Sequence, residues 1–296
     1  MTAPPDMKWG ISTLGCHELD LTAVCQLAAT HRVRHLEIRS LADCLRLPEY
    51  LDANYPADAA SVQKTLDQYR QSIIALNSGF SLISAGDKDR DELLEFARWA
   101  DLLGVPFVRV FGGGDMNTPL SQSDLQTAVH HLQWWKRQRE QNNWRTQIAL
   151  ETHGGFSSGK RCCQLAEAFG SPTEIIWDTH HTWKLGQESF QQTWDQLGPM
   201  VRHVHVKDSV SVPSARHPYS YVLPGKGEFP FFEACTVLHE NNYDGVVSLE
   251  WERKWHPYLS DLETALVALD DSGWRRRSPH SPVDDAAVLQ GVNLST

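Results

Sequence analysis

The chain has 296 residues, of which 41% are hydrophobic, and its 27 basic and 37 acidic side chains give a net charge of −10. Its one basic block is Arg275–Arg277, so composition gives little support to nucleic-acid binding, and a small polar substrate is the better expectation. No stretch approaches the roughly 20 apolar residues of a membrane span, and the N-terminal residues lack the pattern of a secretory signal. We therefore predict a cytoplasmic protein that binds neither nucleic acid nor a membrane.

The six cysteines are scattered along the chain and include no CxxC pair of the kind that indicates zinc or redox work. Cys162 and Cys163 are adjacent, and neighbouring residues cannot form an ordinary structural disulfide with good geometry. We expect reduced thiols.

Apolar runs alternate with amphipathic segments about every 30 to 40 residues, which is typical of βαβ units around a parallel sheet. Strands are expected at Lys8–Leu14, Arg34–Arg39, Ile73–Phe80, Phe107–Phe111, Gln147–Thr152, Glu174–Asp178, Val201–Lys207 and Val246–Trp251. Helices are expected at Leu19–Thr30, Ala59–Gln71, Asp89–Leu103, Ser121–Gln141, Arg161–Phe169, Pro230–Asn241 and Leu259–Leu269. Asp58 is placed to cap the second of these helices.

The number of strand and helix rounds decides the fold class. Eight rounds fit a single (β/α)8 TIM barrel, an α/β fold with a typical size of about 250 residues. A doubly wound sheet would require a glycine-rich phosphate turn after the first strand, and the chain has Ser12–Cys16 there, with no GxGxxG. We assign residues 1–270 to the barrel and residues 271–296 to a short C-terminal tail.

Four of the expected strands have, at or near their end, a residue whose side chain commonly binds metal ions. These residues are Glu151, Asp178, His205 and Glu250. The C-terminal ends of barrel strands meet at one face, so we expect the four side chains to converge. An unpaired buried carboxylate is costly, and three converging carboxylates repel one another, so a divalent metal is the simplest resolution.

The same segments carry a family resemblance. From Lys8 to about Leu269 the chain resembles the xylose isomerase-like TIM-barrel superfamily, the sugar phosphate isomerase/epimerase group that includes D-tagatose 3-epimerase and endonuclease IV. The motifs that carry it are ALETH, DTHH, HVHVKD and YDGVVSLEWER. The resemblance implies that Glu151, Asp178, His205 and Glu250 are the metal ligands, and that His181 binds substrate or a second group of the metal site.

The expected ligand set has a definite chemistry. Three oxygens and one imidazole nitrogen suit one divalent ion with open positions, Mn²⁺ first, with Mg²⁺, Co²⁺ or Zn²⁺ as alternatives. Such an ion polarises a keto-sugar carbonyl and stabilises the enediolate that forms when the adjacent C–H is deprotonated. In the epimerases that the chain resembles, the two ligating glutamates move the proton, which implies catalytic roles for Glu151 and Glu250.

Two further positions are open to more than one interpretation. Glu37 ends the second strand and either binds a sugar hydroxyl or pairs with Arg39 or Arg34. Lys207 either contacts substrate or forms a salt bridge with Asp208 at the strand end.

Histidines cluster near the expected ligands. His203 and His205 alternate along one strand and share a face, so one of them can be a partner of the ligand instead of the ligand itself. His180 and His181 are adjacent on a segment expected to be extended, where they cannot both face the barrel axis, so His180 is expected to be a packing or surface histidine. The epimerase branch has an arginine soon after the metal histidine, and Arg216 is its loose equivalent.

The leading functional prediction is a metal-dependent sugar isomerase or epimerase that acts on a small carbohydrate. The alternative is a lyase or dehydratase that acts on a keto sugar, keto-glycoside or inosose through the same site. A non-catalytic sugar-binding or DNA-binding barrel is disfavoured by the full ligand set. An AP-endonuclease-like enzyme is disfavoured because Asn77–Gly79 and Phe111–Gly113 lack the extra histidines of a trinuclear zinc site. The resemblance also suggests a homodimer or homotetramer.

Overall fold

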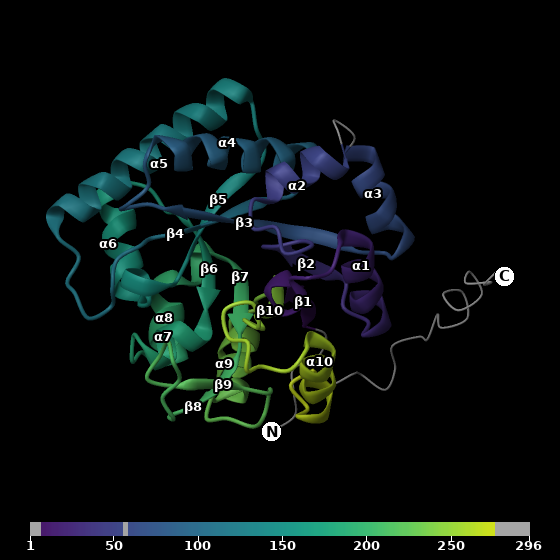
Figure 1. Ribbon diagram of the computed structural model, residues 1–296. Coiled ribbons are helices and arrows are strands. Elements are labelled where there is room, and N and C mark those ends of the chain that lie inside the picture. The colour runs from purple at the N-terminus through teal and green to yellow at the C-terminus, as the bar shows by residue number, and fades with distance from the viewer. Residues whose placement is uncertain (1–6, 56–58, 276–296) are drawn as a thin grey trace.

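Eight parallel strands close into a barrel in the computed structural model, which describes residues 7–55 and 59–275 (Figure 1). Around the barrel the order is β1, β10, β7, β6, β5, β4, β3 and β2. The strands are β1 Lys8–Ser12, β2 His35–Ile38, β3 Ser72–Ser81, β4 Phe107–Phe111, β5 Gln147–Glu151, β6 Glu174–Asp178, β7 Val201–Val206 and β10 Val246–Leu249. The predicted TIM barrel is confirmed, and each strand end lies within two residues of its predicted position.

Helices surround the strands (Figure 1). They are α1 Leu21–Thr30, α2 Leu47–Asn54, α3 Ala59–Gln68, α4 Asp87–Leu102, α5 Gln122–Asn142, α6 Gly159–Phe169, α7 Thr179–Lys184, α8 Phe190–Leu197, α9 Phe231–Glu240 and α10 Leu262–Asp271, with 3-10 turns at Thr13–Cys16, Gly154–Phe156 and Gly198–Met200. The sequence did not predict α2, α7 or α8. The capping role of Asp58 and the tail after Arg275 lie outside the described residues. Within the described ranges, every helix is too short or too polar to cross a membrane.

Alternation along the strands separates the helix layer from the barrel interior. In β6, Trp177 packs against Phe190 and Trp194 of α8, with ring centroids 6.3 and 6.0 Å away. Asp178 is the next residue, and because successive strand side chains point to opposite faces it turns into the interior. An apolar strand thus anchors the barrel to its helices and delivers one carboxylate to the interior at its C-terminal end.

The cysteines take part in this packing and form no disulfide. All six are free, as predicted. Cys25, Cys162 and Cys235 belong to the hydrophobic core.

A small hairpin follows β7, in a segment where we predicted no strand. Its strands, β8 Asp208–Val210 and β9 Ser220–Val222, are antiparallel. The Asp208 carboxylate accepts hydrogen bonds from the backbone N–H groups of Ser209, Gly227 and Phe229 at 2.9, 2.9 and 3.1 Å. Asp208 therefore ties the hairpin to the chain that leads into α9, and the salt bridge considered between Asp208 and Lys207 is not the arrangement found.

Replacing Asp208 tests how much its three hydrogen bonds contribute to the stability of the protein. Asp208→Ala leaves buried N–H groups without their acceptor, so we expect the free energy of unfolding to fall by about 1–3 kcal/mol. Urea denaturation followed by circular dichroism measures the loss. Asp91→Ala, at an exposed position of α4, is the matched control and should leave the midpoint unchanged. Equal midpoints for the two variants would show that the three bonds add nothing to stability.

Candidate metal centre

Four predicted ligands come together at the C-terminal ends of neighbouring strands. Glu151 ends β5, Asp178 ends β6, His205 lies in β7, and Glu250 directly follows β10. One ligand atom from each lies within 4.8 Å of the others, and all four residues are buried. The parallel register of β6 and β7 pairs Asp178 with His205. Convergence thus follows from strand order in the barrel.

The arrangement is centred on one nitrogen of His205. Its Nδ1 atom lies 3.3 Å from Glu250 Oε2, 3.8 Å from Glu151 Oε1 and 4.0 Å from Asp178 Oδ2. This buried Nδ1 has no hydrogen-bond partner, and neither has Glu151 Oε2. Fully buried polar atoms normally have partners, so these two require an explanation.

A divalent cation fits these residues. Atoms bound to one ion at about 2.0–2.2 Å lie no more than about 4.4 Å apart, which is close to the spread of the four ligand atoms. Three oxygens and one imidazole nitrogen are a donor set that Mn²⁺, Mg²⁺, Co²⁺ and Zn²⁺ all accept. The buried side chains could therefore hold one metal ion, with His205 binding through Nδ1.

Lys207 supplies positive charge to the same cluster. Its Nζ lies 2.9 Å from Asp178 Oδ2, 2.5 Å from Glu250 Oε2 and 2.6 Å from Glu252 Oε1. Burial lowers the pKa of Lys207, but the three carboxylates outweigh burial and raise the pKa well above its usual value. Lys207 was predicted to pair with Asp208 or to contact substrate, and in the structure its partners are these three carboxylates.

The two glutamates of the cluster have different electrostatic surroundings. Burial, together with the charge of Glu250, raises the pKa of Glu151 to about 8, although Arg109 opposes this. Burial also raises the pKa of Glu250, but the charges of Lys207 and His205 outweigh it and hold the pKa well below its usual value. The pair is therefore unequal, with the cationic neighbours concentrated on the Glu250 side.

Arg109 is a member of the site that the sequence did not reveal. It lies in β4 and is buried, with Nε 3.3 Å from Glu151 Oε2 and the guanidinium carbon 3.8 Å from the ring centroid of Phe111. Neither Nε nor Nη1 has a hydrogen-bond partner. A polar residue in the middle of the apolar run FVRVF is common in strands, so the sequence did not mark Arg109 as a site residue. Only the fold brings it close to Glu151.

A second layer of polar residues follows the ligands by two positions. His153 follows Glu151, Lys207 follows His205, and Glu252 follows Glu250. Residues two apart on a strand share a face, so this spacing could have marked His153 and Glu252 as site residues. His153 is an exposed residue, and its ring lies 4.6 Å from the Phe111 ring and 5.0 Å from the His181 ring.

The expectation that His180 and His181 lie on an extended segment is wrong, because both lie in α7, which begins directly after β6. Asp178 caps this helix by accepting a hydrogen bond from the backbone N–H of His181 at 2.8 Å. His181 Nδ1 then lies 3.0 Å from Asp178 Oδ2 and 3.1 Å from the Thr152 carbonyl oxygen. A helical turn buries both histidines, and only His181 reaches a predicted ligand.

His180 has the packing role predicted for it. Its ring lies among aromatic side chains, 5.2 Å from Tyr219 and 5.6 Å from Trp183, and its Nε2 is 2.8 Å from Ser209 Oγ. Burial holds its pKa well below the usual value.

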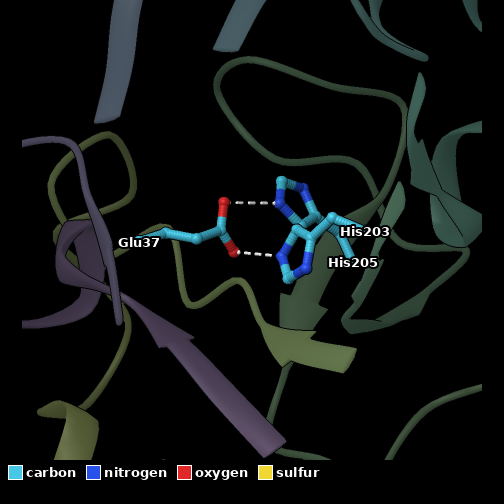
Figure 2. A group of neighbouring side chains, drawn as sticks. All are labelled: Glu37, His203 and His205. Carbon is cyan, nitrogen blue, oxygen red and sulfur yellow. Dashed lines mark hydrogen bonds and ion pairs between the residues drawn. The ribbon is translucent and has the colours of Figure 1, made fainter. Parts of the chain in front are cut away.

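Glu37 and Arg216 were both predicted to contact substrate, and they lie in different surroundings. Glu37 is fully buried and pairs with His203 and His205, and with neither of the arginines considered for it (Figure 2). Burial raises the pKa of Glu37, but the two histidines outweigh burial and hold the pKa well below its usual value. Arg216 is exposed in the connection between β8 and β9, with its guanidinium carbon 5.9 Å from the ring centroid of Trp255. A contact of either residue with substrate stays a prediction.

Comparison with known sequences identifies a family. A sequence model described as the xylose isomerase-like TIM barrel matches residues 26–276. An uncharacterized protein of Mycobacterium tuberculosis is 22% identical over 265 residues, which cover 83% of this chain and 89% of that protein.

Solved structures share the fold at low sequence identity. The probable 3-DHS dehydratase AsbF of Bacillus anthracis aligns with a TM-score of 0.74 at 18% identity, covering 92% of this chain and all of that one (100%). The IOLI protein with a bound zinc atom aligns with a TM-score of 0.71 at 19% identity, covering 90% and 96% of the two chains. D-allulose 3-epimerase from Methylomonas sp. aligns with a TM-score of 0.68 at 15% identity, covering 92% and 98%.

Lys207 offers a test of the charge balance in the cluster. Lys207→Met leaves Asp178 and Glu250 without their shared buried cation, so we expect the chelator-treated protein to lose about 3–5 kcal/mol of unfolding free energy. Denaturant unfolding in the presence of EDTA measures this. Lys254→Met is the control, because Lys254 pairs with the exposed Asp43 at 2.9 Å and its loss should have little effect. A Lys207 variant as stable as this control would contradict the assigned role.

Proposed function

The chain belongs to the xylose isomerase-like TIM barrel family, and from this premise we propose that it is a divalent-metal-dependent isomerase or epimerase of a small carbohydrate. The observation that carries the proposal is the convergence of Glu151, Asp178, His205 and Glu250 within 4.8 Å in a buried site. Mn²⁺ is the proposed ion, with Mg²⁺, Co²⁺ and Zn²⁺ as alternatives. A cytoplasmic location and a homodimer or homotetramer stay predictions.

The order of the strands supports different roles for the proposed ligands, with two transferring protons and two only binding the metal. Around the barrel the sequence is β5, β6, β7, β10, so Glu151 and Glu250 flank Asp178 and His205. A divalent ion bound there would polarise a substrate carbonyl next to the C–H bond to be broken. One flanking glutamate would take the proton from that carbon, and the other would return a proton on the opposite face. Asp178 and His205 would serve as anchors.

The polar layer after the ligands supports substrate binding on the same side. His181 lies beside Asp178 and His153 lies beside His181, with His153 exposed. Lys207 carries three charge-assisted contacts and would orient the carboxylates while presenting positive charge to a substrate oxygen. We propose His181 and Lys207 as substrate contacts.

A lyase or dehydratase is the second candidate, because the site has a group that could act as the acid such a reaction needs. Elimination needs an acid to protonate the departing hydroxyl in addition to the base that removes the carbon-bound proton. Lys207 is a protonated group next to the ligand cluster, whereas desolvation lowers the pKa of His153 to about 4 and that of His181 well below its usual value. The structural similarity to the probable 3-DHS dehydratase AsbF agrees with this candidate at the level of the fold.

The proposed ligands predict metal content. Protein purified without chelator should contain about one divalent ion per chain by mass spectrometry, and Glu250→Gln should bind it more weakly because one of four ligands is lost. Glu174→Gln is the matched control, since Glu174 lies at the other end of β6 and pairs with Arg202. Undiminished metal in a combined Asp178→Asn, His205→Ala and Glu250→Gln variant would overturn the assignment.

Solvent deuterium distinguishes the two reactions. Incubated in D₂O with a panel of ketoses, 3-keto-glycosides and inososes, an epimerase should return substrate and epimer labelled at the carbon next to the carbonyl, whereas a dehydratase should release an unsaturated product. Glu151→Gln and Glu250→Gln should each lower the rate by about 10²- to 10⁴-fold, because each removes a proton-transfer group. Label incorporation that persists at the full rate in both variants would refute the proton-transfer roles.

A further inference from the structure

Glu37 is a buried carboxylate that the proposed reaction does not use. It lies on β2 and is fully buried. Its two histidine partners lie on β7, and β1 and β10 separate β2 from β7 around the barrel, so these contacts cross the barrel interior. Figure 2 shows the carboxylate facing the edges of two imidazole rings, those of His203 and His205.

Both oxygens of Glu37 are occupied. Oε1 lies 2.7 Å from His203 Nε2, and Oε2 lies 2.8 Å from His205 Nε2 and accepts a further hydrogen bond from Asn77 Nδ2 at 3.1 Å. A carboxylate only accepts hydrogen bonds, so each ring must carry its proton on Nε2. The geometry therefore places a proton on Nε2 of both histidines.

The proton on Nε2 of His205 determines which ring nitrogen can bind a metal. With Nε2 protonated, an imidazole can bind a metal ion only through the lone pair of Nδ1. In His205 this is the buried atom without a hydrogen-bond partner that faces Glu250, Glu151 and Asp178 at 3.3, 3.8 and 4.0 Å. The bond to Glu37 thus points Nδ1 of His205 at the centre of the ligand cluster.

We propose that Glu37 is a positioning residue of the metal centre, which holds His205 in the Nε2-protonated form and fixes the orientation of its ring for metal binding through Nδ1. His203 and Asn77 hold the carboxylate in place from its other sides. The inference rests on the proposed metal site. Partners of this kind usually change metal affinity by about 10- to 100-fold when they are removed.

The test measures Mn²⁺ affinity by competition with a chelator, so it needs no substrate. Glu37→Gln keeps the side-chain shape but removes the charge and one acceptor, and we expect about 10- to 100-fold weaker Mn²⁺ binding. His203→Gln keeps a donor for Glu37 and should cost less affinity than Glu37→Gln. Glu174→Gln, the charge loss at the far end of β6, should bind Mn²⁺ as the wild-type protein does. Circular dichroism and thermal unfolding check that each variant folds.

A second measurement does not depend on a folded variant. Nitrogen-15 NMR of the histidine rings in wild-type protein loaded with Zn²⁺ should show His205 protonated on Nε2 and bound to zinc through Nδ1. A proton on Nδ1 would overturn the inference. This measurement decides the matter if Glu37→Gln fails to fold.

The remaining outcomes separate the inference from the function on which it rests. If the wild-type protein binds one Mn²⁺ and Glu37→Gln binds it equally tightly, the positioning role falls and the metal site stands. If the wild-type protein binds two ions and both Glu37→Gln and His203→Gln bind one, then Glu37 and His203 are ligands of a second ion and the positioning role is wrong. If the wild-type protein binds no divalent ion, the proposed function falls, and the inference falls with it.

Discussion

Three carboxylates buried around one imidazole nitrogen are the constraint on which the rest of the site depends. Glu151, Asp178 and Glu250 are at most 4% exposed, so solvent cannot screen their mutual repulsion. The chain compensates within the same interior, since Lys207 lies against two of the carboxylates and Arg109 against the third. The register of the barrel strands fixes these positions, so the cluster cannot relieve its repulsion by moving apart.

The two halves of the chain contribute different parts of this arrangement. The four proposed ligands come from β5, β6, β7 and the end of β10, all in the second half of the sequence. Strands of the first half supply Glu37, Asn77 and Arg109. Glu37 contacts His205, Asn77 donates a hydrogen bond to Glu37, and Arg109 contacts Glu151. Closing the sheet between β1 and β10 is what brings the two halves together, because it places β2 across the interior from β7.

The convergence of Glu151, Asp178, His205 and Glu250 could be predicted from sequence because its signal is local. An apolar run that ends in a carboxylate or imidazole is visible in four to six residues, as in EIIWD before α7. The partners of Glu37 are 166 and 168 residues away along the chain, and no local pattern indicates them. Helix α7 was missed for another reason: THHTWK has no helical pattern of apolar residues, and the helix forms because the Asp178 side chain caps it.

The segments after the strands determine what can approach the centre. Beyond β5 His153 is an exposed residue, whereas beyond β10 the side chain of Glu252 is only 14% exposed. Beyond β7 the hairpin β8–β9 covers Lys207, whose Nζ lies 5.4 Å from the centroid of the Tyr221 ring. Lys207 is consequently as buried as the ligands although it lies two residues nearer the barrel mouth. The strands thus set the ligand chemistry, while this hairpin and α7 set the space above it, where differences between relatives would act on substrate choice.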